Sequence, residues 1–315
     1  PATTESYTLS LHDALPILAK GNLEQLQALK SVLDDNHLAL VAEAGGLSQW
    51  NAKLGDQFGE ASARQELDWC RLWWSSPEEG GCGGRYAYVI MDDPLYRGLF
   101  PNDKDEGRSL DEVANELADA ILVWKQTFPG IKIVLGCNFP NWGWKGSPAY
   151  FNMPAMKGPM GRGDYYPVLI RAVEVLRERS IELWGLILDN PFDYIEKFAW
   201  SNQRDLIEPV DLIARSLDVE ATAHSLGLKF GLYANTDIQD LEPEGVFTQA
   251  ERDQLYSVHQ RNYFEAYRAA GGEPDFWNTY SWMKSPSKLT PDTEPYTQSW
   301  NVSQLIKRLR GLPED

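Results

Sequence analysis

The stretches RYAYVIMDDP at residues 85–94 and IKIVLGCNFP at residues 131–140 flank a helical pattern, SLDEVANELADAILVWKQ, at residues 109–126. Each flanking stretch is a short apolar run that ends in polar residues, which is typical of a buried strand. Ser109 and Glu112 have the spacing of a capping box, which predicts where the helix begins. Strand, helix and strand in this order predict two parallel strands joined by a helical crossover.

The same alternation recurs along most of the chain. Apolar strand-like runs begin near residues 38, 86, 131, 183, 228 and 274, at intervals of 45 to 52 residues, and helical patterns separate them. A period of this length indicates repeated βα units, and polar residues close each strand at the same register. We therefore predict the α/β class and a (β/α)8 TIM barrel, in preference to an open doubly wound sheet.

The two ends of the chain fit this repeat less well. Codons for YTLSLHDALPI, residues 7–17, can be chosen to resemble, base for base, a common adapter used in preparing DNA sequencing libraries, and residues 2–5 also fit it. We interpret residues 1–17 as a non-native leader and residues 18–315 as a single barrel domain. The native first strand would then be lost, together with any signal peptide, and YTLSL can occupy its place. The eighth unit would comprise PYTQSW as a poor strand and a closing helix to residue 311.

Composition excludes several classes of function. The formal charge is −17, or −15 without the leader, which repels phosphate backbones and argues against nucleic acid as a partner. No apolar run approaches the roughly 18 residues of a membrane span, so we expect no membrane partner. Cys70, Cys82 and Cys137 are too few for a disulfide scaffold and lack zinc-site spacing, although a Cys70–Cys82 bridge is compatible with the sequence.

Reactive side chains in a βα barrel come from the carboxyl ends of the strands, where this sequence is rich in carboxylates and amides. VIMDDP and LILDNP share one pattern: three apolar residues, Asp, then Asp or Asn, then Pro. We expect each Pro to hold the residue before it in an extended conformation. There is no strand-end His, G-x-S-x-G, H-E-x-x-H or P-loop, so hydride, phosphoryl and serine chemistry are not indicated. His37, His224 and His259 are interpreted as ordinary histidines away from this rim. The strand-end candidates are Glu43, Asp92, Asp93, Asn138, Asn141, Asp189, Asn190, Tyr233, Asn235, Asp237, Asn278 and Tyr280.

Tryptophan is unusually frequent, at 12 of 315 residues, and many Trp residues stand beside Gly, Asn or Pro. Flat aromatic faces in polar loops can stack on sugar rings, although a core role is the alternative for about half of them. Trp73 and Trp74, at a probable helix end, are interpreted as structural. Residues 138–163 show no helical or strand period, which indicates a binding loop. Lys145 and Arg162 are candidate hydrogen-bond donors there, and the candidate sugar-stacking residues are Trp50, Trp142, Trp144, Trp277 and Trp282.

Through its strand-end carboxylates and aromatic loops, the sequence resembles the superfamily of barrel glycoside hydrolases across about residues 21–311. The resemblance implies hydrolysis of a β-linked polysaccharide or oligosaccharide, with Asp92 or Asp93 and Asp189 as the acid and the base or nucleophile, and Glu43 as the next candidate. It implies a carbohydrate partner, no cofactor and no metal, and it makes export plausible. The chain departs from the pattern in having no Asn-Glu pair at a strand end, so acid and nucleophile roles are not transferred.

Two other functions fit the same residues. In a metal-dependent barrel lyase or aldolase, Glu43, Asp92, Asp93 and Asp189 would bind Mg²⁺, Ca²⁺ or Mn²⁺ through oxygen. In a non-catalytic sugar-binding barrel, the amide-rich rim would bind carbohydrate without turnover. Oligomeric state, the glycan and the stereochemical outcome are not determined by the sequence.

Overall fold

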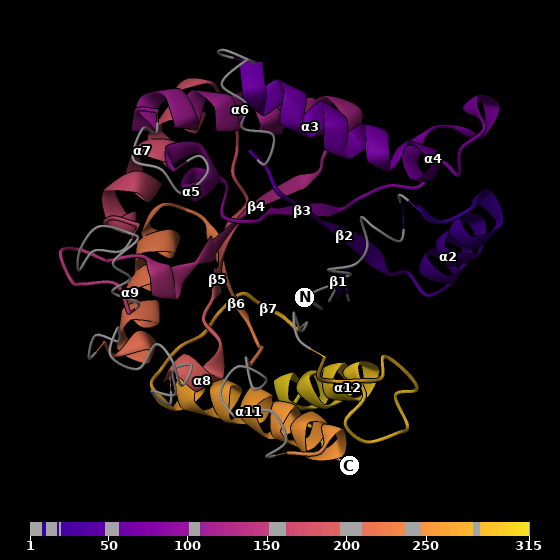
Figure 1. The fold of residues 1–315 in the computed structure, drawn as a ribbon, viewed down its shortest axis with the longest axis vertical. Helices are drawn as coiled ribbons and strands as arrows, with labels where there is room; N and C mark the ends of the chain where they lie inside the picture. Colours follow the sequence, from indigo (N-terminus) through magenta and orange to yellow (C-terminus); the bar gives the residue numbers. More distant parts are fainter. Residues whose placement is uncertain are drawn as a thin grey trace. The chain divides into compact units, whose positions relative to one another are not determined.

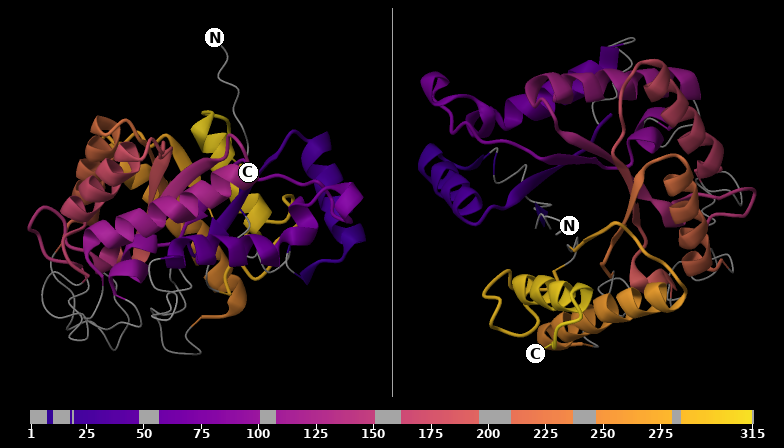
Figure 2. Two further views of the ribbon diagram at one scale, coloured as in Figure 1. Left: turned by 90° about the horizontal axis from the view of Figure 1, so that it is seen from above. Right: turned by 180° about the vertical axis from the view of Figure 1, so that it is seen from behind.

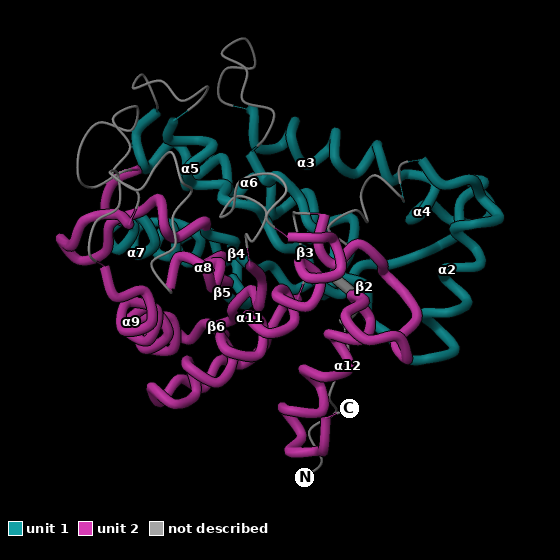
Figure 3. The backbone as a smooth tube through the Cα atoms, turned by 60° about the horizontal axis from the view of Figure 1, so that its bottom comes forward, with its two compact units in different colours: residues 1–137, 165–186 teal, residues 138–164, 187–315 magenta. Residues whose placement is uncertain are grey.

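The computed structural model describes residues 8–10, 18, 20–47, 57–100, 108–150, 162–195, 210–236, 247–279 and 284–314. The chain divides into two compact units (Figure 3). Unit 1 comprises residues 1–137 and 165–186, and unit 2 comprises residues 138–164 and 187–315. The single barrel domain over residues 18–315, and the non-native origin of the leader, stay predictions.

Strands and helices alternate along the described chain (Figure 1). The strands are β1 (Thr8–Ser10), β2 (Ala39–Ala44), β3 (Tyr88–Met91), β4 (Lys132–Asn138), β5 (Gly185–Asp189), β6 (Lys229–Tyr233) and β7 (Phe276–Asn278). The helices are α2 (Leu23–Asp35), α3 (Phe58–Trp69), α4 (Arg71–Trp74), α5 (Pro94–Leu99), α6 (Leu110–Thr127), α7 (Tyr165–Glu178), α8 (Phe192–Ile195), α9 (Leu212–Ser225), α11 (Gln249–Ala269) and α12 (Gln298–Leu309), with 3-10 turns η2 (Pro77–Glu79) and η4 (Phe139–Asn141).

The sheet has the sequential order β1 to β7, so each strand is hydrogen-bonded to its neighbours in the sequence. In unit 1 the pairs from β1 to β4 are parallel, and in unit 2 β6 and β7 are parallel, with Tyr233 opposite Asn278. Each predicted strand from residue 38 onward begins within two residues of an observed one. Sequential parallel strands with helical crossovers confirm a TIM-barrel-like α/β fold at this level.

The prediction for the first strand of the repeat agrees with the structure, whereas the prediction for the eighth strand does not. Thr8–Ser10 pairs in parallel with Ala39–Val41, so a part of YTLSL occupies the first-strand position that the repeat predicts. The prediction of a strand at PYTQSW is wrong, because residues 295–297 form turns and α12 begins at Gln298. The Thr297 side chain caps α12 by accepting a hydrogen bond from the Trp300 amide, which commits this segment to a helix start.

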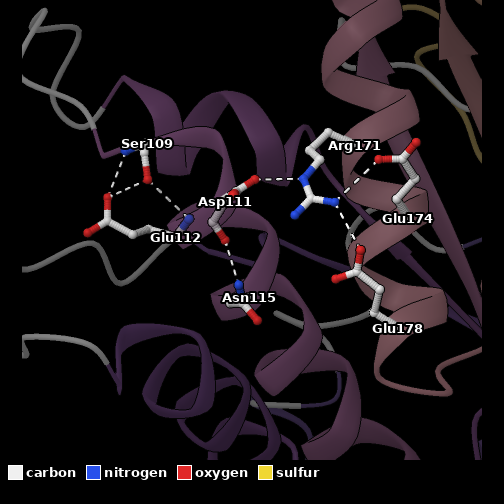
Figure 4. A network of polar contacts seen from close by, with 7 residues as sticks. All are labelled: Ser109, Asp111, Glu112, Asn115, Arg171, Glu174 and Glu178. Atoms are coloured by element: carbon white, nitrogen blue, oxygen red, sulfur yellow. Dashed lines mark hydrogen bonds and ion pairs between the residues drawn. The ribbon is translucent and has the colours of Figure 1, made fainter.

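Helix α6 begins as predicted from its capping box. The Ser109 amide donates to Glu112 Oε2 at 2.8 Å, and the Glu112 amide donates to Ser109 Oγ at 3.3 Å (Figure 4). In the same first turn, Asp111 accepts a 2.7 Å hydrogen bond from Arg171 Nε of α7. Arg171 also pairs with Glu174 and Glu178, and these hydrogen bonds raise its pKa above the ordinary value. The cap sets the start of α6, and the ion pairs join α6 to α7.

Helices α3 and α6 run side by side in unit 1 (Figure 1, Figure 2). The first turn of α3 has no side-chain cap from Gln57, and instead the Gly59 amide donates to Glu116 Oε2 of α6 at 2.7 Å, in a buried position. A carboxylate at a helix N-terminus satisfies an open amide and interacts favourably with the helix dipole. A Cβ at Gly59 would lie only 1.9 Å from the Glu116 carbonyl oxygen. The close approach of the two helices therefore requires glycine.

In unit 2, helix α11 contacts the end of β6 through polar side chains. Gln260 Nε2 donates to the Ala234 carbonyl at 3.1 Å and also to Thr279 Oγ1. From α12, Gln298 Nε2 donates to the Thr279 carbonyl at 2.9 Å. Two buried or half-buried glutamines thus satisfy backbone groups just beyond β6 and β7, where the ladder hydrogen bonds end.

The cysteines do not form disulfides: Cys70, Cys82 and Cys137 are buried free thiols. Burial raises the pKa of Cys70 to about 11, with a hydrogen bond to Tyr86 acting in the opposite direction. A thiol that stays protonated at neutral pH is a poor nucleophile. Cys70 is therefore a packing residue.

We expect Gly59→Ala to destabilise the protein by about 1–3 kcal/mol or more, because a methyl group cannot fit against the α6 backbone. Urea unfolding followed by circular dichroism measures the change. Gln65→Ala, at an exposed position of the same helix, is the control and should change stability by less than about 0.5 kcal/mol. Equal stability of the two variants would contradict the tight α3–α6 contact.

Candidate functional site

In unit 1, three predicted carboxylates follow neighbouring strands. Glu43 lies on β2, and Asp92 and Asp93 follow β3 directly. The Asp92 amide donates to the Ala44 carbonyl at 2.7 Å, and the Asp93 amide donates to the Gly136 carbonyl at 3.2 Å. These hydrogen bonds hold the two aspartates between the ends of β2 and β4, as the strand-end pattern predicts.

Asp93 differs from the prediction in its backbone. Its φ and ψ are both 45°, in the left-handed region, where we expected the extended conformation because Pro94 follows. The left-handed turn lets α5 begin at Pro94 immediately after the strand, and it buries Asp93 to 4% exposure. A non-glycine residue in this region is strained, and such strain often marks a functional position. The negative charge of Asp93 also contributes, after burial and Cys137, to the raised pKa of Tyr165.

Asp92 lies in a more open environment than Asp93. Its side chain is 31% exposed and forms an ion pair with Arg97, whose Nε also donates to the Asp92 carbonyl at 3.0 Å. Burial alone would lower the pKa of Arg97, but the charges of Asp92 and Asp93 raise it above its ordinary value. Sequence analysis missed Arg97, although its position five residues after Asp92, within a short helix, was a usable signal.

In unit 2, the carboxyl ends of β5 and β6 are joined by side chains and backbone. Asn235 Nδ2 donates to Asp189 Oδ1 at 2.8 Å, and the Phe192 amide donates to the Asn235 carbonyl at 3.1 Å. Asn190 is fully buried and donates to Ser216 Oγ of α9 at 2.8 Å. Asp189 therefore has a fixed orientation, whereas Asn190 serves the helix packing behind it.

Three buried amides at these strand ends have incomplete hydrogen bonding, and one of them is Asn190, whose Oδ1 has no hydrogen-bond partner among the described residues. Asn235 is 3% exposed and Asn278, on β7, is 7% exposed. Among the described residues, Asn235 Oδ1 and Asn278 Nδ2 have no hydrogen-bond partner. Tyr233 is opposite Asn278 in the parallel register, so Asn235 follows two residues beyond the position that pairs with Asn278. Unpaired buried polar atoms are costly, so Asn235 Oδ1 and Asn278 Nδ2 are candidates for contact with a ligand.

Sequence analysis also missed a buried pair beside this site. His259 Nδ1 lies 2.8 Å from Asp193 Oδ1, and Thr236 Oγ1 donates to the other oxygen of Asp193. His259 is therefore near the carboxyl end of β6, and our placement of it away from the rim is wrong. A single histidine within a helix, ten residues after its start, gave no sequence signal for this contact.

The Trp residues of the 138–163 loop are buried. Trp142 is 0% and Trp144 is 3% exposed, so neither presents an open face for sugar stacking. Trp144 Nε1 donates to Asp218 Oδ2 at 2.6 Å, and Lys145 Nζ donates to Asp218 Oδ1 at 2.9 Å. From α9, Arg215 donates to the Trp142 carbonyl at 3.3 Å. This part of the loop is packed on α9, and we do not retain its two Trp residues as platforms.

Some of the remaining candidate site residues pack or hydrogen-bond within the protein, and others lie outside the residues that the structure describes. Asn138 Oδ1 accepts a 2.9 Å hydrogen bond from Asn141, and the Arg162 amide donates to the Asn141 carbonyl. Tyr233 is buried, and Trp277 packs edge-on against Tyr263. Four predicted residues lie outside the described residues: Trp50, Asp237, Tyr280 and Trp282.

The described part of the chain has no helix that is long and apolar enough to cross a membrane. Within the same residues, no group of three or more His, Cys, Asp or Glu side chains could hold a metal ion.

Comparison with known proteins supports the fold. No protein-family model and no curated protein matches the sequence. A BuGH86 variant in complex with neoagarooctaose matches with a TM-score of 0.50 and 13% identity, over 90% of this chain and 46% of that chain. A GH10 xylanase from Thermobacillus composti gives 0.45 and 12%, over 92% and 81%, and a β-glucosidase from Thermotoga maritima gives 0.42 and 15%, over 88% and 73%. This chain is thus similar in fold to the BuGH86 variant, and it spans about half of that chain.

We expect Asp218→Asn to destabilise the protein by about 1 kcal/mol at pH 7. Burial alone would raise the pKa of Asp218, but hydrogen bonds from Lys145 and Trp144 outweigh it and lower the pKa below 3.8. A depressed folded-state pKa contributes stability above the unfolded-state value, and this stability is lost as the pH falls through the folded-state value.

The difference in unfolding free energy between wild type and Asp218→Asn should therefore shrink as the pH falls below about 4. Urea titrations at several pH values measure it. A difference that is constant down to pH 2 would show that the Asp218 charge does not stabilise the loop.

Proposed function

We propose that this protein is a glycoside hydrolase that acts on a β-linked polysaccharide or oligosaccharide. The observation that carries the proposal is the β5–β7 strand-end site of unit 2, defined by Asp189, Asn235 and Asn278. There a carboxylate is fixed by a buried amide, and two buried amide atoms have no hydrogen-bond partner among the residues that the structure describes. The similarity in fold to the BuGH86 variant supports the barrel architecture on which such a site is usual.

The hydrogen-bonding capacity of Asn235 Oδ1 and Asn278 Nδ2 fits a carbohydrate ligand. A sugar hydroxyl can donate to Asn235 Oδ1 or accept from Asn278 Nδ2. A sugar with adjacent hydroxyls can therefore supply the missing hydrogen-bond partner of each amide. An anionic ligand could accept a hydrogen bond from Asn278 but would be repelled by Asp189. An apolar ligand could form a hydrogen bond with neither asparagine. The site therefore favours a neutral polyhydroxylated substrate.

Hydrolysis of a glycosidic bond requires a protonated group for the leaving oxygen and a carboxylate for the nucleophile or base role. Asp189 is our candidate in unit 2, and Asp92, Asp93 and Glu43 are the candidates in unit 1. Asp92 forms an ion pair with Arg97, whereas Asp93 is buried at 4% exposure. We propose that the acid and the nucleophile or base come from these four residues.

The test is reducing-sugar release from a panel of plant, algal and microbial polysaccharides, with and without a chelator. We expect Asp189→Asn and one of Asp92→Asn, Asp93→Asn and Glu43→Gln to lower kcat by about 10²–10⁴-fold. Asp34→Asn, at an exposed position of α2, is the control. Activity that a chelator abolishes and metal restores would identify the metal-dependent alternative. Sugar binding without turnover, unchanged in Asp189→Asn, would identify a binding protein.

A second test separates function from stability. Asn278→Leu removes an unpartnered buried amide, so we expect unchanged or higher thermal stability together with a 10- to 100-fold loss of kcat/KM, roughly one hydrogen bond to substrate. Asn301→Leu in α12 is matched, because Asn301 is 1% exposed and its Nδ2 also lacks a partner among the described residues. It should keep full activity. Full activity in Asn278→Leu would remove Asn278 from the site.

A further inference from the structure

The Asp193–His259 pair is built from three separate elements of unit 2. Asp193 comes from α8, Thr236 follows β6, and His259 lies in the middle of α11. The side chain of Asp193 is 0% exposed, and its two oxygens accept from His259 Nδ1 at 2.8 Å and from the Thr236 hydroxyl. A buried carboxylate is stable only with such partners, so this geometry is strongly constrained.

The contacts determine which ring nitrogen of His259 carries the fixed proton. The Thr236 hydroxyl uses its hydrogen on Asp193, so at 3.2 Å from Nδ1 its oxygen can only accept. Asp193 and Thr236 are then both acceptors for the same Nδ1–H group. Nδ1 therefore carries a proton, and the other nitrogen, Nε2, is the one that can accept or donate to a ligand.

The ring is held but not covered. Phe192 packs against it edge-on, with ring centroids 5.4 Å apart, which prevents rotation of the imidazole. The His259 side chain is 18% exposed, and Nε2 has no hydrogen-bond partner among the described residues. An oriented imidazole with one open nitrogen is suited to binding a ligand.

The position of the pair relates it to the Asp189–Asn235 contact. Thr236 is next to Asn235 in the chain, and Asp193 is four residues after Asp189, so both contacts join the same two strand ends. We propose that His259 is a substrate-contacting residue whose Nε2 hydrogen-bonds to a sugar hydroxyl, with Asp193 and Thr236 as its positioning residues. This inference rests on the proposed function and adds a contact that the strand-end pattern does not contain.

Two substitutions of His259 distinguish the roles of its two ring nitrogens. Asn reproduces a donor near Nδ1 and removes Nε2, so His259→Asn should fold normally by circular dichroism and lose about 10- to 100-fold in kcat/KM on the best polysaccharide. Gln places an amide near Nε2, so His259→Gln should recover part of that loss. Asp193→Asn should lower kcat/KM similarly, because it no longer fixes the ring.

His224 supplies a matched control. His224 Nε2 lies 2.9 Å from Asp275 Oδ2, at the amino end of β7, in the same unit but at the opposite end of the strands. His224→Asn should leave kcat/KM within twofold of wild type. If His259→Asn also stays within twofold while Asp189→Asn is inactive, the hydrolase stands and the role of His259 is overturned.

A spectroscopic measurement decides the inference independently of turnover. The chain contains four histidines, so long-range ¹H–¹⁵N spectra can be assigned with His259→Asn and His224→Asn. We expect His259 to carry its proton on Nδ1 and its Nε2 signal to shift when the hydrolysed oligosaccharide is added to Asp189→Asn. A ring protonated only on Nε2, or an Nε2 signal that does not respond, would overturn the proposal. Inactivity of wild type on every polysaccharide would instead contradict the hydrolase, and the proton position would still test the His259 geometry.

Discussion

Parallel hydrogen bonding between strand ends is the constraint on which the candidate site depends. Beyond the last paired residues, the backbone continues to bond across the edge: Asp92 to Ala44 in unit 1, and Ala234 to Asn278 in unit 2. These bonds fix the first residues after each strand, where the polar side chains stand. A strand-end residue is consequently held by backbone, although its side chain is free to serve a ligand.

The two units use this constraint in different ways. Unit 1 gathers charge, with Asp92 and Asp93 beside Arg97, and a left-handed turn at Asp93 that moves one carboxylate inward and leaves the other half-exposed. Unit 2 gathers amides and one histidine, and its open hydrogen-bonding atoms are buried. Charged groups suit proton transfer, and buried amides suit recognition of hydroxyls.

Much of the polar structure supports these edges without belonging to the site. Gln260 and Gln298 satisfy the carbonyls just past β6 and β7, and Glu116 satisfies the first turn of α3. Each such hydrogen bond satisfies a backbone group that has no regular partner, because the strand or helix ends there. The two glutamines therefore support the strand ends of unit 2 and the glutamate supports the start of α3, although none of them has a role in the proposed reaction.

Local sequence signals determined the strands, the helix starts and the strand-end carboxylates, because apolar period, capping boxes and turn residues act over a few neighbours. They did not determine the left-handed Asp93, the burial of Trp142 and Trp144, or the Asp193–His259 pair. Tertiary packing decided these: α5 had to begin directly after β3, α9 covered the loop, and α11 brought His259 to residues 66 and 23 positions earlier in the chain. Contacts between distant segments leave no periodic trace in the sequence, so only the folded chain shows them.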